Sequence, residues 1–243
     1  MMGEKKVALV TGGATGIGSA CVRELSARGF RIGICFRSSV EAAERLLAVI
    51  DDGFLLPVDL ADIAQIDLTM DKLKEETDHV DVLVNNAGVS IDIDMLRMKI
   101  EQFDAQRVAA RGAWYLTKRI LRQNMLRANR GRIINISSVV GHTGNAGQIP
   151  YTMEKAAMDA LTKSLCRELR GRNILVNSVA PGFILTDMTL RLPQEVSEGI
   201  ISAIPLGRMG QPEEIAEVVG FLAASGSYIT GTVIHVNGGL YGG

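Results

Sequence analysis

The chain has 243 residues, of which 47% are hydrophobic and 22% charged, and its 26 basic side chains nearly balance 27 acidic ones. This length and composition fit one globular domain with a sizeable core. The net charge of −1 argues against nucleic acid or an anionic membrane as the main partner, and no apolar run approaches the roughly 18 residues of a membrane span. We therefore expect a single domain over residues 1–243, located in the cytoplasm and acting on a small molecule.

Short apolar runs recur along the chain, with helical patterns between them. The runs lack polar alternation, which is typical of strands buried on both faces. The apolar runs are Val7–Val10, Ile32–Phe36, Val82–Val84, Ile133–Ile136, Ile174–Val176 and Thr232–Val236. A further strand, the third in chain order, is expected before Asp59. Four-residue rows such as Ile17, Cys21 and Leu25 suit helices that cover a sheet. The alternation predicts an α/β fold, a Rossmann-type doubly wound parallel sheet of about seven strands with helices on both faces.

One long stretch near the C-terminus departs from this alternation. Residues 183–210 are irregular in pattern and carry Pro193 and Pro205. Excursions of this length between regular elements often form lids over a bound ligand. We therefore predict a substrate lid at about residues 183–210.

A glycine-rich loop follows the first predicted strand and opens the first helix. It reads Gly12-Gly13-Ala14-Thr15-Gly16-Ile17-Gly18. Glycines let the backbone approach a ligand, and a helix N-terminus offers unpaired N–H groups and partial positive charge to phosphates. Such turns also occur for purely conformational reasons, but a strand before and a helix after are the context of a dinucleotide-binding loop. We predict that this loop binds the pyrophosphate of a dinucleotide.

The residues that follow the second and third strands bear on which dinucleotide is bound. An acidic residue after the second strand would bind a free ribose 2′-hydroxyl, but the chain has Arg37 in this region. Arginine pairs with a 2′-phosphate instead, which favours NADP over NAD; the alternative is an ordinary surface arginine. Asp59 and Leu60 are candidates to contact the adenine, and the alternative for Asp59 is a cap on the next helix.

Three side chains in the second half of the chain form a candidate catalytic set. Tyr151 and Lys155 are four residues apart at the start of a predicted helix, so both project from one face. A buried lysine beside a phenol would favour the phenolate and lower the tyrosine pKa from about 10 toward neutral pH. Tyr151 would then protonate a ketone oxygen as hydride arrives at carbon, while the hydroxyl of Ser138 holds that oxygen. The set predicts ketone reduction, and no His, Cys and carboxylate cluster has the spacing of a metal site.

Together these motifs resemble those of the short-chain dehydrogenase/reductase family over essentially the whole chain. The resemblance implies that Tyr151 is the proton donor, that Lys155 binds the nicotinamide ribose, and that Ser138 orients the substrate. The matching segments are Gly12-x-x-x-Gly16-x-Gly18, Asn85-Asn86-Ala87-Gly88, Ser138, Tyr151-x-x-x-Lys155 and Pro181-Gly182. It also implies further contacts to NADP from Asn86, Ala87, Gly88, Tyr151, Lys155, Pro181, Gly182, Ile184 and Thr186.

Within that family the sequence is most similar to the 3-oxoacyl-[acyl-carrier-protein] reductases. The similarity rests on the segments Met95–Lys99, Ile133–Gly141, Ala180–Ile184, Thr186–Thr189, Ile229–Gly231 and His235–Tyr241. It implies NADPH-dependent reduction of a 3-oxoacyl thioester, bound to acyl carrier protein or coenzyme A, in fatty-acid-type synthesis by a homotetramer. An acidic carrier protein would dock on basic residues near the active-site mouth. Arg130 and Arg172 are the candidates, and their alternative is a generic solvated surface.

The match breaks at one position of the family's catalytic set. Most family members carry an asparagine in the helix before the fifth strand, where it anchors a water that links the lysine to solvent. Here its place falls on Ala109 or Ala110, depending on the direction of counting. The loss leaves open a proton path rebuilt with other groups, slower turnover, or a dinucleotide-binding homologue acting in a hetero-oligomer. A short-chain dehydrogenase for another ketone is a further alternative. Thr15 is a second departure, because many NADP-dependent relatives have an arginine there.

Overall fold

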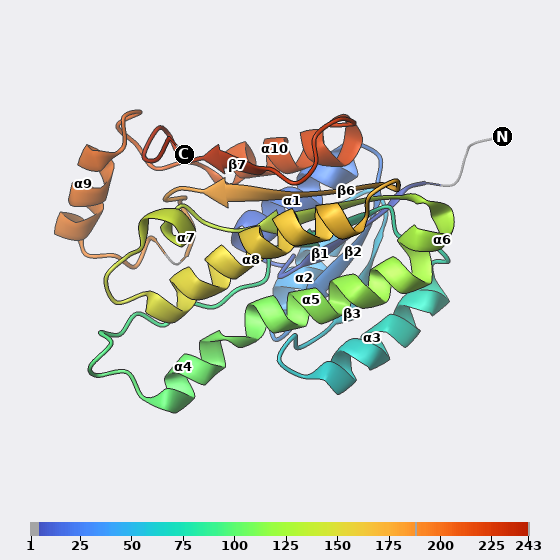
Figure 1. Ribbon diagram of the computed structural model, residues 1–243, viewed down its shortest axis with the longest axis horizontal. Helices are drawn as coiled ribbons and strands as arrows, with labels where there is room; N and C mark the ends of the chain where they lie inside the picture. The colour runs from blue at the N-terminus through green and yellow to red at the C-terminus, as the bar shows by residue number, and fades with distance from the viewer. Residues whose placement is uncertain (1–4, 188, 243) are drawn as a thin grey trace.

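A seven-stranded parallel sheet runs through the computed structural model, which describes residues 5–187 and 189–242 (Figure 1). Its order is β3-β2-β1-β4-β5-β6-β7, and each neighbouring pair is parallel. The strands are β1 Val7–Thr11, β2 Arg31–Phe36, β3 Gly53–Pro57, β4 Val82–Asn85, β5 Arg130–Ile136, β6 Asn173–Pro181 and β7 Val233–Val236. The predicted doubly wound fold is confirmed. Residues 1–4, 188 and 243 of the predicted domain lie outside the described residues.

Helices cover both faces of the sheet (Figure 1). Their bounds are α1 Gly16–Ala27, α2 Val40–Leu47, α3 Ile63–Glu76, α4 Ile100–Gln106, α5 Val108–Ile120, α6 Leu126–Ala128, α7 Val140–Thr143, α8 Ile149–Glu168, α9 Gln194–Ala203 and α10 Pro212–Ala224, with a π-helix at Leu121–Met125. The helices α1, α2 and α10 pack on one face in one apolar cluster. On the other face α3, α5 and α8 pack in a second cluster. The sheet is therefore the middle layer of three.

The continuous apolar strands follow from this double burial. Successive side chains of a strand point to opposite faces, so a strand covered on both sides needs apolar residues at every position. Leu9 of β1 packs in the cluster beneath α3 and α5, whereas Val10 packs in the cluster beneath α1 and α10. All five residues of β1 are buried. The absence of alternation in the sequence was therefore the correct indicator of a central sheet.

The predicted lid begins and ends at one place in the fold. The amide of Leu185 donates to the Gly210 carbonyl oxygen over 2.9 Å, and the Gly210 amide donates to the Phe183 oxygen over 2.9 Å. Between these points the chain forms α9, which lies at one end of the molecule (Figure 1). Residues 183–210 therefore form a loop whose two ends are joined by backbone hydrogen bonds. Its role as a substrate lid stays a prediction, and position 188 within it is not described.

Three rings hold the C-terminal segment against α7 and β7. The ring centroid of His142 lies 4.7 Å from that of His235 and 5.3 Å from that of Tyr241, and the last two rings lie 5.0 Å apart. An oxygen of the buried Asp159 carboxylate lies 2.9 Å from His142 Nε2. Burial lowers the pKa of His235 below its usual 6.5, and the neighbouring His142 lowers it further, against the opposing charge of Asp159. The cluster therefore favours a neutral His235.

We expect acid to destabilise the chain partly through His235. Because its pKa is lower in the folded chain, the unfolded chain binds more protons below pH 6.5, so this stabilisation is present above pH 6.5 and lost as the pH falls. His235→Phe keeps a ring that takes no proton. Its free energy of unfolding should therefore fall less than that of the native chain between about pH 7.5 and pH 5.5. Urea titrations at both pH values test this, and an equal fall in both proteins contradicts it.

No helix within the described ranges is both long and apolar enough to span a membrane.

Candidate active site

The predicted site residues meet at one edge of the sheet. Because all seven strands run in parallel among the described residues, their carboxyl ends share an edge, which is where open α/β sheets bind ligands. The loop from Gly12 to Gly18 follows β1, and the segment from Asn86 to Gly88 follows β4. Ser138 follows β5, while Pro181 ends β6. The fold thus gathers residues that are far apart in the sequence.

Close backbone packing shapes the glycine loop. Gly12 has a φ of 60°, in the left-handed region that glycine tolerates. A Cβ on Gly18 would lie 2.1 Å from the Gly12 carbonyl oxygen and 2.7 Å from Asn86 Nδ2. That amide group donates to the carbonyl oxygens of Thr11 and Gly12 over 2.9 and 3.2 Å. The start of α1 therefore packs directly on the loop, as a cradle for a pyrophosphate requires.

The helix that follows the loop leaves its first turn open to an anion. Thr15 is the N-cap residue of α1, and its side chain caps no backbone amide of the helix. Thr186, at the start of the predicted lid, lies above this turn, because its Cγ2 atom is 3.6 Å from where a Cβ of Gly16 would be. Uncapped N–H groups at a helix N-terminus attract phosphate. The residues present therefore fit a dinucleotide.

The loop is joined to the strand that leads to Arg37. The Gly13 amide donates to the Cys35 carbonyl oxygen over 2.9 Å, and Thr11 pairs with Cys35 in the sheet. Arg37 follows two residues later and is exposed to solvent at the same edge. Its guanidinium is thus available to a ribose 2′-phosphate of a dinucleotide held by the loop. The contact itself stays a prediction.

Asp59 does not cap the next helix, so that alternative is wrong. Its Oδ1 atom accepts a hydrogen bond from the Ala61 amide over 2.9 Å, within the turn after β3. The N-cap of α3 is Asp62, whose carboxylate accepts hydrogen bonds from the amides of Ala64 and Gln65. Leu60 is nearly buried, and a Cβ on Gly112 would lie 2.3 Å from its carbonyl oxygen. Both predicted adenine contacts lie at the carboxyl end of β3.

The turn after β6 is fixed by its neighbours on both sides. The Val139 amide donates to the Pro181 carbonyl oxygen, and the Gly182 amide donates to the Val236 oxygen, over 2.8 and 2.9 Å. A Cβ on Gly182 would lie 2.8 Å from the Cα of Asn237, so only glycine fits there. Ile184 beyond the turn is buried. The Pro181–Gly182 turn therefore lies beside the loop that carries Ser138.

The three predicted catalytic residues come together between β5 and α8. Pro150 in the first turn of α8 suits a helix start, and Tyr151 and Lys155 follow on one face. Lys155 Nζ donates to the Ile136 carbonyl oxygen over 2.8 Å and lies 5.5 Å from the ring centroid of Tyr151. Ser138 is buried two residues beyond Ile136, and it hydrogen-bonds the Tyr151 hydroxyl. The hydroxyl groups and the amine thus surround one small region.

The expected lowering of the tyrosine pKa is wrong for this structure. Burial raises the pKa of Tyr151 to about 12, the charge of Asp92 raises it further, and the hydrogen bond with Ser138 opposes both. Burial also lowers the pKa of Lys155 to about 8, against the opposing charges of Asp159 and Glu154. Desolvation is the largest effect on both pKa values because both groups are removed from water. At neutral pH Tyr151 therefore carries its proton, as a general acid must.

A chain of buried polar side chains lies behind this set and was not predicted. Asn85 Nδ2 donates to Asn135 Oδ1 over 2.9 Å, and Asn135 Nδ2 donates to Thr162 Oγ1 over 2.7 Å. Thr162 Oγ1 and Ser178 Oγ lie 2.8 Å apart. Asn85, Asn135 and Ser178 face one another across β4, β5 and β6. Their only signal in the sequence is a polar residue inside an otherwise apolar run.

Of the two alanines at which the family's asparagine is expected, Ala109 lies beside the catalytic set. A cavity of about 10 Å³ lies beside Tyr151 and Lys155, and Ala109 is among the residues that line it, whereas Ala110 is not. The same cavity is lined by Glu154, which the sequence reasoning missed. Its signal was an acidic residue next to Lys155 on a helix that covers the sheet. The choice between Ala109 and Ala110 as the position of the missing asparagine stays a prediction.

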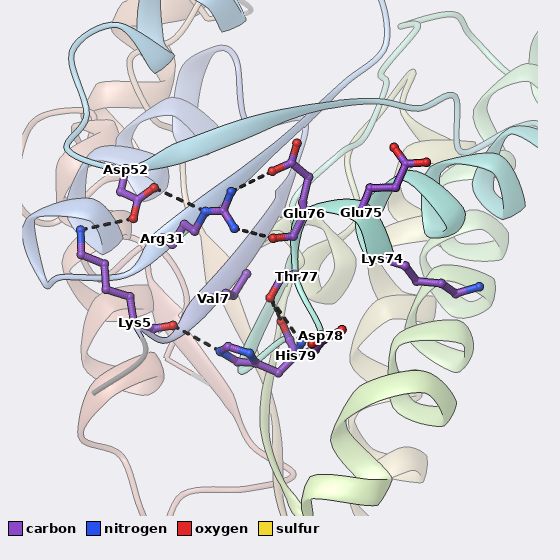
Figure 2. Close-up of a pocket in the computed structure, with 10 residues that line it drawn as sticks. All are labelled: Lys5, Val7, Arg31, Asp52, Lys74, Glu75, Glu76, Thr77, Asp78 and His79. Atoms are coloured by element: carbon purple, nitrogen blue, oxygen red, sulfur yellow. Dashed lines mark hydrogen bonds and ion pairs between the residues drawn. The ribbon is translucent and has the colours of Figure 1, made fainter. Parts of the chain in front are cut away.

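A larger cavity lies at the opposite edge of the sheet (Figure 2). It has a volume of about 480 Å³ and is lined by Val7 and Arg31, the first residues of β1 and β2. Figure 2 shows the Arg31 guanidinium between the carboxylates of Asp52 and Glu76. Its nitrogens lie 3.4 Å from an Asp52 oxygen and 2.8 Å from a Glu76 oxygen, and Lys5 Nζ lies 3.3 Å from the other Asp52 oxygen. These charges already pair with one another. The cavity is also separated from the glycine loop by the length of the strands, so it is not the candidate active site.

The two arginines predicted for carrier docking also lie at that opposite edge. Arg130 begins β5 and pairs in register with Asn173, which follows Arg172 at the start of β6. Strand β5 is seven residues long, which is roughly 23 Å of extended chain, and Ser138 lies beyond its other end. Arg130 Nε lies 2.9 Å from the buried Asp81 carboxylate. The prediction that Arg130 and Arg172 lie near the active-site mouth is therefore wrong for the active site of the same chain.

Comparison with known proteins agrees with this geometry. A family model described as enoyl-(acyl carrier protein) reductase matches residues 12–241. A Haemophilus influenzae protein named 3-oxoacyl-[acyl-carrier-protein] reductase FabG is 45% identical over 240 residues, covering 97% of this chain and 98% of the relative. A protein of the same name from Aquifex aeolicus is 43% identical, covering 97% of both chains, and one from Escherichia coli is 42% identical, covering 98% of both chains. The chain therefore belongs to the short-chain dehydrogenase/reductase family of nicotinamide-dinucleotide-dependent oxidoreductases.

Proposed function

We propose that the chain reduces a 3-oxoacyl thioester to the 3-hydroxyacyl thioester with NADPH, the acyl group being carried by acyl carrier protein or coenzyme A. The observation that carries this proposal is the meeting of the glycine loop with Ser138, Tyr151 and Lys155 at one sheet edge. The relatives are named for the same reaction over nearly the whole chain. This function belongs to fatty-acid-type synthesis.

Each side chain has one role in the proposed reaction. A dinucleotide held by the glycine loop would supply the hydride that the ketone carbon receives. The Tyr151 hydroxyl gives its proton to the ketone oxygen, so that hydride and proton together convert the ketone to an alcohol. Ser138 holds the same oxygen by a hydrogen bond, and the Lys155 ammonium stabilises the phenolate that remains. Lys155 is oriented for this by its hydrogen bond to the Ile136 carbonyl oxygen at 2.8 Å.

The experiment is NADPH oxidation by the purified native chain with three substrates: acetoacetyl-coenzyme A, crotonoyl-coenzyme A and a free 3-oxo ester. We expect acetoacetyl-coenzyme A to be reduced fastest. A preference for crotonoyl-coenzyme A would favour the enoyl reduction named by the family model, and a preference for the free ester would favour a reductase of another ketone. No NADPH oxidation with any of the three would support a non-catalytic homologue.

We propose NADP as the cofactor because an exposed Arg37 follows β2 where an acidic residue would select NAD. In Arg37→Asp the 2′-phosphate would meet a carboxylate, so we expect its Kd for NADPH to rise about tenfold or more, while its Kd for NADH changes little. Fluorescence titration of both dinucleotides measures this. The control is Arg45→Asp, an exposed arginine of the next helix. An equal loss in both variants would show a general charge effect and contradict a direct phosphate contact.

We propose a homotetramer packed through α5 and α8 and through the C-terminal strand β7. Large apolar side chains are exposed on both helices, with Trp114 of α5 at 49% and Met153 of α8 at 41%. Exposed apolar side chains of this size favour association of chains. Light scattering of the purified chain tests the number of copies, and a monomer at micromolar concentration would overturn the proposal.

A further inference from the structure

Glu154 is a buried acidic residue beside the catalytic set with no role in the reaction as proposed so far. It precedes Lys155 on α8, and only 4% of its surface is exposed. A buried carboxylate is costly unless other groups satisfy its charge. Glu154 is also conspicuous because it lines the same cavity as Tyr151, Lys155 and Ala109.

The contacts of Glu154 connect it to the surface on one side. Its Oε2 atom accepts a hydrogen bond from the Ala110 amide over 2.7 Å, at the start of α5, where the helix has no side-chain cap of its own. Its Oε1 atom lies 3.6 Å from Arg107 Nε, and the Arg107 side chain is 47% exposed. The amide and the guanidinium thus give the buried carboxylate two polar partners. Arg107, at the break between α4 and α5, thus links Glu154 to solvent.

On its other side Glu154 acts on Lys155. The carboxylate charge raises the pKa of Lys155, as does the charge of Asp159, while burial lowers that pKa to about 8. The cavity between Glu154, Tyr151 and Lys155 has a volume of about 10 Å³. That is about the space of one water molecule, and the groups around it include a carboxylate, a phenol and an amine. A water there would have enough polar partners.

We propose that Glu154 is a positioning residue for the reductase reaction, holding a water in the cavity beside Ala109 through which protons return to Lys155 and Tyr151. The proposal rests on the proposed function. Tyr151 loses a proton to the ketone oxygen in each turnover, and its phenolate regains one from the Lys155 ammonium. The neutral amine is then reprotonated by the cavity water. The Glu154 carboxylate takes up a proton from solvent beside Arg107 and passes it to the hydroxide that this leaves, so that water and carboxylate are both restored. Every group ends in its starting state, with one solvent proton consumed.

The first test is Glu154→Gln, which keeps the shape and an oxygen to accept the Ala110 hydrogen bond but carries no charge. We expect kcat to fall about tenfold and the KM for NADPH to stay within about twofold. The alkaline limb of the kcat profile should move to lower pH by about one unit, because Lys155 loses the charge that favours its protonated form. The solvent deuterium isotope effect on kcat should rise as proton return becomes slower. A purely structural cap moves neither pH limb nor isotope effect.

A matched control is Glu168→Gln, an exposed glutamate on the same helix, which should match the native chain in all three measurements. If Glu154→Gln keeps the native kcat, pH profile and isotope effect, the proposal is overturned. If the native chain reduces no thioester at all, the proposed function fails instead. The two failures are therefore distinguishable.

A second variant tests the water without touching the carboxylate. Ala109→Val fills the cavity with methyl groups and leaves Glu154 in place, at a small cost in helix propensity. We expect a kcat several-fold lower with the alkaline limb unmoved, since the charge on Lys155 is retained. Native kcat in this variant would overturn the cavity route, even if Glu154→Gln did not fold.

Discussion

Tyr151→Phe is expected to lower kcat for thioester reduction by about 10³-fold, within the range that a general acid contributes. The variant keeps the ring that packs against Lys155, whose Nζ atom lies 5.5 Å from its centroid, and removes only the hydroxyl that Ser138 contacts. The Kd for NADPH should stay within a few-fold of the native value. Steady-state kinetics and fluorescence titration of the two proteins measure both quantities.

Tyr115→Phe is the matched control for this experiment. Its hydroxyl hydrogen-bonds Asp67 over 2.9 Å on the helix face between α3 and α5, away from the catalytic set. It should therefore lose less than about twofold in kcat, as expected of a remote site. If Tyr151→Phe retained more than a tenth of the native kcat, another group would be the proton donor, and the assignment of Tyr151 would be wrong.

Gly18→Ala is expected to abolish tight dinucleotide binding. The new Cβ would lie 2.1 Å from the Gly12 carbonyl oxygen, which belongs to backbone and cannot turn aside. The loop or the start of α1 must shift, and the Asn86 hydrogen bonds to the loop shift with it. We expect the Kd for NADPH to rise about 100-fold or more, because misplaced amides no longer converge on the phosphates. The free energy of unfolding should fall by about 1–3 kcal/mol.

The same substitution at another helical glycine is the control. A Cβ on Gly199 of α9 has no atom within 4 Å, and its φ is not positive. Gly199→Ala should therefore bind NADPH normally and gain about 0.5–1 kcal/mol of stability from the reduced backbone entropy. Native NADPH affinity in Gly18→Ala would contradict the role of the loop. Isothermal calorimetry with chemical unfolding separates the binding effect from the stability effect.

The fold was predictable because its signals are local. Each apolar run marks a strand covered on both faces, and Leu9 and Val10 pack in opposite clusters as that pattern requires. Tyr151 and Lys155 were identified for the same reason, since spacing on a helix fixes which side chains share a face. The weaker predictions involve the strand ends. Arg130 is the first residue of β5 and Arg172 directly precedes β6, and in a parallel sheet that alone places both opposite the catalytic edge.

Burial explains what the sequence did not reveal about the site. The pKa of Tyr151 is raised rather than lowered, because desolvation depends on how the helices pack and not on the spacing from Lys155. Likewise, nothing in the sequence shows that Glu154 turns inward to the Ala110 amide instead of facing solvent, where glutamates usually lie. The break between α4 and α5 that creates this contact becomes visible only in three dimensions.

The buried chain from Asn85 through Asn135 and Thr162 to Ser178 has a consequence for how the strands find their partners. Valine and isoleucine in β4, β5 and β6 would pack almost equally well if one strand slid past another by a residue, since both faces of the sheet are apolar. The side-chain amides of Asn85 and Asn135 would lose their partners in such a shifted sheet, and a buried amide without a partner costs about 1–3 kcal/mol. Correct alignment is therefore encoded by a few polar side chains, and replacing Asn135 by leucine should yield a chain that folds into several competing alignments.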